Sequence, residues 1–105
     1  MKHSKPFRNI ELEQLKNPEC AKEYLQISLE ETRKDGNRAA FLRALRNVVD
    51  ARGGVVSLAE RTNKPTSTLY KAISEEGNPR LDTLDMILND IGLQLSIDII
   101  KQNCA

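Results

Sequence analysis

The sequence predicts an all-α domain of about five helices, two of which form a helix-turn-helix, followed by a short C-terminal β-strand. Apolar residues recur three and four positions apart through most of the chain, which is the spacing of one helix face. Asn, Gly and Pro residues stand where these periodic stretches begin or end. From residue 93 to residue 100 the spacing changes to alternation, which is typical of a strand.

Composition indicates one globular domain. The 105 residues are enough for a single modest core, and 39% hydrophobic with 30% charged residues is typical of a folded chain rather than a disordered one. The net charge of +1 does not by itself indicate a nucleic-acid binder. Residues 81–105 carry four Asp and a single Lys, so we expect this end of the chain to face away from any phosphate backbone.

The two cysteines, Cys20 and Cys104, are far apart and match no metal-ligand spacing. Two such cysteines suit a reducing compartment, so we expect a cytoplasmic protein. No apolar run approaches the roughly 18 residues that a membrane span needs, so no membrane partner is expected.

Residues 1–16 are predicted to be an N-terminal arm, and residues 17–105 the helix-turn-helix domain. The arm has two interpretations. It packs loosely on the domain, as chain ends often do, or it orders only against a partner protein.

The first helix of the domain begins at Asn17-Pro18-Glu19, which combines an N-cap residue, a proline in the first turn and an acid near the helix N-terminus. It runs to about Arg33, and Gly36 is the expected left-handed stop. Its predicted buried stripe consists of Ala21, Tyr24, Leu25, Ser28 and Leu29.

A second helix is expected from about Arg38 to Arg52, ended by Gly53-Gly54. Its predicted buried stripe consists of Phe41, Leu42, Leu45, Val48 and Val49.

The segment from Val55 to Ser74 predicts the helix-turn-helix. Its first helix is expected to begin near Ser57, a good N-cap residue. In the turn, Asn63 falls where a left-handed residue is needed. Pro65 then opens the second helix.

In the second helix of this motif, Leu69 and Ile73 are four apart and should point into the core. The opposite face is small, polar and basic, as expected of a helix whose first residues contact base edges and phosphates. Lys64 flanks this helix, and the loop after it would pass a phosphate backbone. The predicted DNA-binding residues are Thr66, Ser67, Thr68, Tyr70, Lys71, Lys64, Asn78 and Arg80.

Two residues of this region have competing interpretations. Tyr70 is expected either to contact a phosphate or to pack over the helix pair. Arg61 is interpreted as an ordinary solvated charge.

The last helix is expected from about Leu81 or Thr83 to Ile91, ended by Gly92. Its predicted core face consists of Leu81, Leu84, Ile87, Leu88 and Ile91.

The C-terminal strand, residues 93–100, alternates apolar and polar residues up to Ile99. A single strand needs a partner for its backbone groups and its apolar face. Residues 8–15 offer only a weak internal partner. We therefore expect pairing with the same strand of a second subunit, or with another protein; the alternative is a loosely packed extended tail.

The sequence contains no constellation for catalysis. The only histidine, His3, has no candidate acid–base partner, and the acids of the last helix, Asp82, Asp85 and Asp90, are not spaced to converge on a cation. We therefore expect neither enzyme activity nor a cofactor.

Several short sequence motifs resemble those of the antidote (antitoxin) proteins of bacterial type II addiction modules. These motifs are ALRNV, LYKAIS, EGNP and ILNDIGLQLSI, with PECAKEYLQISLEE upstream. The chain looks like a HigA-like antitoxin with a helix-turn-helix of the Cro and phage-repressor type, over roughly residues 17–99.

The resemblance implies a cytoplasmic homodimer with two tasks and no catalysis. Such a protein would neutralise its cognate partner, a small RelE-like ribonuclease toxin. It would also bind the double-stranded DNA operator of its own operon as a repressor. The turn departs from the family pattern, because Asn63-Lys64-Pro65 replaces the usual Gly, apolar residue and polar cap. A free-standing repressor and a pure interaction module without DNA affinity are the other interpretations.

Overall fold

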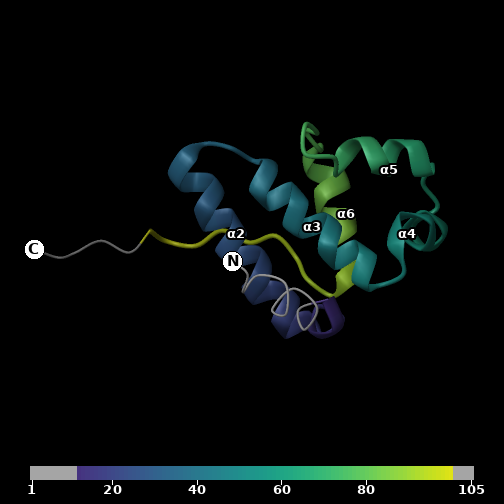
Figure 1. Ribbon diagram of the computed structural model, residues 1–105, viewed down its shortest axis with the longest axis horizontal. Coiled ribbons are helices and arrows are strands. Elements are labelled where there is room, and N and C mark those ends of the chain that lie inside the picture. Colours follow the sequence, from purple (N-terminus) through teal and green to yellow (C-terminus); the bar gives the residue numbers. More distant parts are fainter. Residues whose placement is uncertain (1–11, 101–105) are drawn as a thin grey trace, which may run out of the picture.

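The computed structural model describes residues 12–100, which form an all-helical fold (Figure 1). The helices are α2 (Pro18–Asp35), α3 (Ala39–Ala51), α4 (Gly54–Thr62), α5 (Thr66–Ala72) and α6 (Leu81–Ile91). Helix α3 packs against α2 and α4, and α4 also packs against α5 and α6. The predicted all-α class is confirmed for this part of the chain.

Both ends of α2 form as the sequence predicts. The Asn17 side chain accepts a hydrogen bond from the backbone N–H of Glu19 at 2.8 Å. At the other end Gly36 is left-handed, with φ at 72°, and its N–H donates to the carbonyl of Thr32 at 2.7 Å. These two caps satisfy backbone groups that a helix end otherwise leaves unpaired.

The core is aliphatic and its centre is α3. Leu42, Leu45, Val48 and Val49 are at most 2% exposed, and Phe41 packs at the edge of the core, so the predicted stripe is confirmed. The core receives the following buried side chains from the neighbouring segments: Leu15, Ala21, Leu25, Val55, Leu58, Ala59, Leu69, Ile73, Ile87, Leu88 and Ile91.

Two residues predicted to be buried are exposed. Leu81 is 73% exposed because it is the first residue of α6 and follows an exposed loop. Leu29 is 37% exposed, since only the Ala21 and Leu25 side of α2 reaches the core.

The end of the predicted N-terminal arm is partly described. Residues 12–14 form a helical turn, and Leu15 after it is 2% exposed in the core. Residues 1–11 of the arm lie outside the described residues.

Helix α4 begins earlier than predicted. It starts at Gly54, so the expected start near Ser57 is wrong. Gly53 and Gly54 both have positive φ, at 107° and 89°, so the chain turns at the glycine pair and α4 starts at its second residue.

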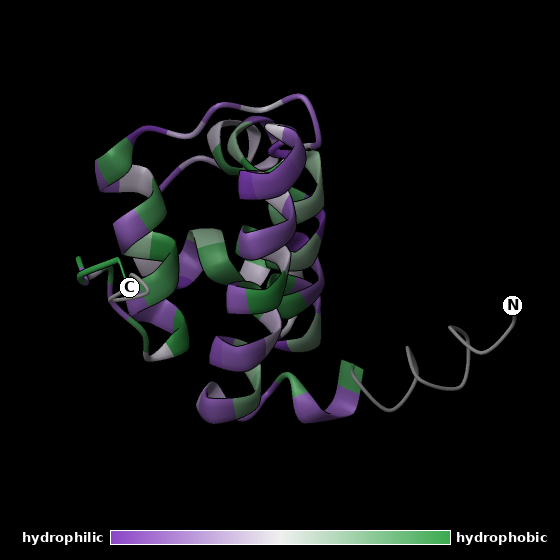
Figure 2. Ribbon diagram, turned by 90° about the vertical axis from the view of Figure 1, so that its left-hand side faces the viewer, coloured by the Kyte–Doolittle hydropathy of each residue, from purple (hydrophilic) through white to green (hydrophobic). Residues whose placement is uncertain are grey.

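The C-terminal strand is not present among the described residues. Residues 93–100 contain no regular secondary structure and lead away from α6 at the edge of the molecule (Figures 1 and 2). Leu93 still packs against the core, and its N–H donates to the carbonyl of Leu88 at 2.8 Å. The predicted strand is therefore not seen in a single copy of the chain, because ladder hydrogen bonds need a second strand.

Candidate nucleic-acid interface

The candidate interface is built on α5 and on the turn before it. Asn63 is left-handed, with φ at 59°, as predicted, and its C-cap position ends α4. Pro65 occupies the N-cap position of α5, one residue before the helix rather than in its first turn. Leu69 and Ile73 are 0% and 1% exposed, so they attach α5 to the core as expected.

All eight residues predicted to contact DNA are exposed. On α5 the buried Leu69 places its exposed neighbours on the opposite face, which therefore carries hydroxyl groups and the charge of Lys71. Lys64 is exposed in the turn.

The structure brings four of the eight residues together around one hollow. Thr68 and Lys71 come from α5, and Asn78 and Arg80 come from the loop before α6. Glu76 also lines this hollow, so its positive charges are partly offset. The other four predicted residues, Lys64, Thr66, Ser67 and Tyr70, do not line it.

Tyr70 packs against α3. The guanidinium carbon of Arg46 lies 5.3 Å from the centre of the Tyr70 ring, which is cation–π geometry. Arg46 also pairs with Asp50 at 3.1 Å. Packing is thus the interpretation of Tyr70 that its described contact supports, although the residue remains 44% exposed.

Two arginines of α3 and its N-cap hold the loop that carries Asn78 and Arg80. Arg38 donates from Nε to the carbonyl of Gly77 at 2.6 Å, and Arg43 pairs with Glu75 at 3.0 Å. These contacts could not be predicted from the sequence, because they join residues more than 30 positions apart. The sequence shows only that a basic residue, Arg38, stands at the start of a helix. It does not show that the loop at Gly77 is its partner.

Gly77 allows this loop to lie directly on the end of α5. The residue is buried, and a Cβ placed on it would meet the carbonyl oxygens of Lys71 and Ala72. The sequence therefore needs glycine here for close backbone approach rather than for a positive φ.

Arg61 is not the free solvated charge that the sequence suggested. Its guanidinium donates to both carboxylate oxygens of Asp90, at 2.9 and 2.8 Å, and so joins α4 to α6. The Asp90 side chain is only 13% exposed. The hydrogen bond from Arg61 lowers the pKa of Asp90 below its usual value, and the charges of Arg61 and Arg52 act in the same direction.

The pair predicts a pH-dependent difference between the wild type and Asp90→Asn. Because the folded-state pKa is lowered, the stabilisation is present above the unfolded pKa of about 3.9 and is lost as pH falls through the folded pKa. At pH 7 we expect the free energy of unfolding of Asp90→Asn to be about 1 kcal/mol lower than that of the wild type. The difference is modest because Arg61 is 42% exposed to solvent.

Urea unfolding at pH 7 and at pH 3 measures this difference. Asp82→Asn is the matched control, because Asp82 is 76% exposed and lies 3.7 Å from Arg80. A difference between the wild type and Asp90→Asn that grows toward acid pH would contradict the assignment.

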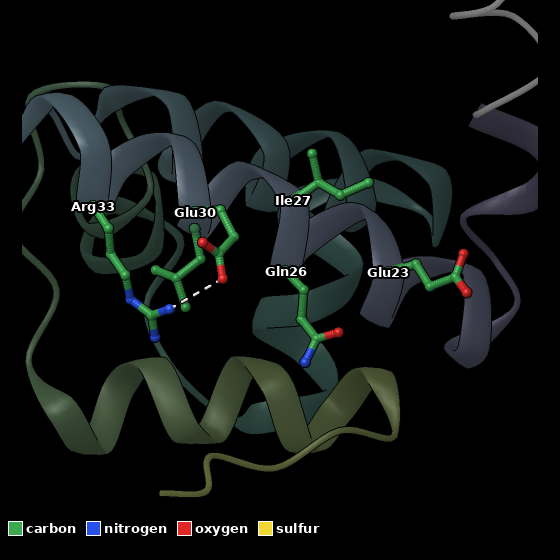
Figure 3. A pocket seen from close by; sticks show the side chains of 6 residues that line it. Glu23, Gln26, Ile27, Glu30 and Arg33 are labelled. Atoms are coloured by element: carbon green, nitrogen blue, oxygen red, sulfur yellow. Dashed lines mark hydrogen bonds and ion pairs between the residues drawn. The ribbon is translucent and has the colours of Figure 1, made fainter. Parts of the chain in front are cut away.

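A second hollow lies on the solvent side of α2 (Figure 3). Gln26, Glu30 and Arg33 point to one side of it, and Arg33 donates to Glu30 at 3.2 Å. Ile27 points away from them and is 65% exposed. None of the predicted DNA-binding residues lies here.

Across residues 12–100, no three His, Cys, Asp or Glu side chains are placed to hold a metal ion. None of the helices described has both the length and the apolarity needed to cross a membrane.

Comparison with known proteins connects this structure to one family. Searches of curated proteins and of solved structures returned no match. The family model of the probable addiction module antidote proteins matches residues 7–99, which cover every helix described above. The chain therefore belongs to the family of probable addiction module antidote proteins.

Proposed function

We propose that the chain is the antitoxin of a type II toxin–antitoxin module and neutralises a cognate RelE/HigB-like ribonuclease toxin by direct binding. The observation that carries this proposal is the family match over residues 7–99, because an antidote implies a toxin partner. In this proposal the chain is a cytoplasmic protein that acts by binding rather than by catalysis.

The same proposal includes repression of its own operon. The exposed face of α5, with Ser67, would enter the major groove of the operator, and Lys71, Asn78 and Arg80 beside it would contact the phosphate backbone. The hydrogen bond from Arg38 to the carbonyl of Gly77 supports this role, because it holds the loop of Asn78 and Arg80 in place beside α5. Operators are commonly read by two-fold symmetric proteins, so the chain would act as a homodimer.

Purification of the tagged full-length chain from its native cells tests the toxin interaction. We expect a small basic protein at one-to-one stoichiometry, whose expression alone stops growth and whose co-expression with this chain restores it. A chain that purifies without such a protein, yet binds the DNA upstream of its own gene, would establish the alternative of a stand-alone repressor. The observation that favours this alternative is the exposed surface of α5, which needs no toxin to contact DNA.

Lys71→Ala tests the DNA interface. Lys71 is exposed, so the variant should fold normally, and the loss of one phosphate contact should weaken binding by about tenfold at low salt. The slope of log affinity against log salt should fall by about 0.9. Fluorescence anisotropy with a duplex from upstream of the gene measures both quantities.

Lys22→Ala is the matched control for this experiment. Lys22 is an exposed lysine on α2, outside the proposed interface, so its loss should leave the salt slope unchanged. Equal affinities for Lys71→Ala and the wild type would remove Lys71 from the interface. An affinity that is weak and insensitive to salt in the wild type would favour a pure interaction module.

A further inference from the structure

The segment from Leu93 to Ile100 carries four of the exposed large hydrophobic side chains of the described residues. Leu95 is 40% exposed, Ile97 is 100% exposed, Ile99 is 88% exposed and Ile100 is 78% exposed. Figure 2 shows this segment as a hydrophobic trace beside α6. Contiguous apolar surface of this kind marks an interaction site in a folded protein.

Within residues 12–100, the backbone of the segment also has no strand partner. The N–H of Leu93 donates to the carbonyl of Leu88. Beyond that bond, the described hydrogen bond of this backbone is a local one, in which the N–H of Ile99 donates to the Asp98 side chain at 2.9 Å. An extended segment with free N–H and C=O groups is a template for strand pairing. Its start is fixed, because Leu93 packs against the core.

We infer that the partner of this segment is the same segment of a second copy, paired antiparallel about a two-fold axis at Ser96. This inference rests on the homodimer of the proposed function and specifies its interface. We choose a second copy as the partner because the sequence of the segment is complementary to itself. In a stable pair, apolar side chains lie opposite apolar ones on one face, and polar side chains lie opposite polar ones on the other.

Pairing about Ser96 satisfies that requirement from Leu93 to Ile99. Leu93 then lies opposite Ile99 of the second copy, and Leu95 lies opposite Ile97. On the other face Gln94 lies opposite Asp98, so an amide can donate to a carboxylate, and Ser96 lies opposite its own counterpart.

Other registers satisfy it less well. An axis at Ile97 places Gln94 opposite Ile100, and an axis at Asp98 places two like charges opposite each other, which is destabilising. An axis at Leu95 places Ile99 opposite Ile91, which belongs to α6 and cannot pair as a strand. If one strand slips by one residue against the other, its apolar side chains turn to the opposite face and lie opposite polar ones.

Cysteine cross-linking tests the register in the full-length chain. Directly opposed residues in an antiparallel pair have Cβ atoms about 4.5–5.5 Å apart, close to the separation of about 3.5–4.5 Å that a disulfide needs. Ser96→Cys, in a background with Cys20→Ser and Cys104→Ser, should form a covalent dimer in most chains on mild oxidation. A non-reducing gel and intact mass measure the yield.

Gln94→Cys in the same background is the matched control. It lies on the same face, but its counterpart is four residues away along the paired strand, so it should remain uncross-linked. Efficient cross-linking of Gln94→Cys together with none of Ser96→Cys would overturn the register.

Ile97→Lys tests the dimer itself. Ile97 is fully exposed in one copy, so the variant should keep the thermal stability of the isolated fold while changing from a dimer to a monomer in sedimentation. Ile27→Lys, at another exposed isoleucine on α2, should stay dimeric.

Two outcomes would overturn the inference. One is a wild-type chain that sediments as a monomer at all concentrations. The other is a segment that gains protection from proteolysis only when a co-purified protein is added, which would make that protein the strand partner. The toxin proposal fails separately, because a chain that cross-links through Ser96→Cys and yet purifies without a toxin would keep this dimer and lose the antitoxin role.

Discussion

Leu69→Ala is expected to lower the free energy of unfolding by about 3 kcal/mol, within the range for leucine truncation in a packed core. Leu69 is 0% exposed and, with Ile73, attaches the seven-residue helix α5 to the rest of the molecule. A helix this short is not stable alone, so losing its anchor should also disorder the face that carries Lys71. Urea unfolding measures the first effect, and anisotropy with the upstream duplex measures the second.

Leu81→Ala is the matched control for this substitution. It removes the same atoms from a leucine that is 73% exposed, so it should change the free energy of unfolding by less than about 0.5 kcal/mol. Similar losses for the two variants would show that α5 is not held by Leu69.

Gly77→Ala is expected to cost about 2–4 kcal/mol, because overpacking against rigid backbone is among the mechanisms of severe destabilisation. The new Cβ would lie 2.6 Å from the carbonyl oxygen of Lys71 and would also clash with that of Ala72. Either the loop or the last turn of α5 must move. The bond from Arg38 to the Gly77 carbonyl should then break. Thermal and urea unfolding measure the cost.

Gly36→Ala separates this clash from ordinary glycine strain. Gly36 has φ at 72°, and no atom lies within 4 Å of the place that an added Cβ would take, so alanine there suffers only the left-handed backbone. We expect a loss of about 1 kcal/mol. A loss at Gly77 no larger than that at Gly36 would rule out the steric explanation.

Sequence analysis predicted what is decided locally. The Asn17 cap, the left-handed Gly36 and Asn63, and the stripe of α3 all depend on residues within one or two helical turns. The same locality explains the exposed α5 face, since burying Leu69 and Ile73 places their intervening neighbours outward.

The features that sequence analysis missed depend on distant partners. The contacts of Arg38 with Gly77 and of Arg61 with Asp90 join residues 39 and 29 positions apart, and periodicity says nothing about which surface a long side chain will reach. The alternation from Leu93 to Ile99 is present in the sequence, but a strand forms only where a second strand supplies hydrogen bonds. One described copy supplies none.

The position of α4 has a consequence for how the molecule responds to force or to a bound protein. Helix α4 packs against α3, α5 and α6, whereas α5 has its main helix contact with α4 alone. Any partner that displaced α4 by a fraction of a helical turn would carry α5 with it. The loop at Gly77 is bonded to Arg38 at the start of α3 and also lies against the end of α5. A displacement of α5 relative to α3 would therefore strain this loop, and the alignment of α5 with Asn78 and Arg80 is the quantity that would change.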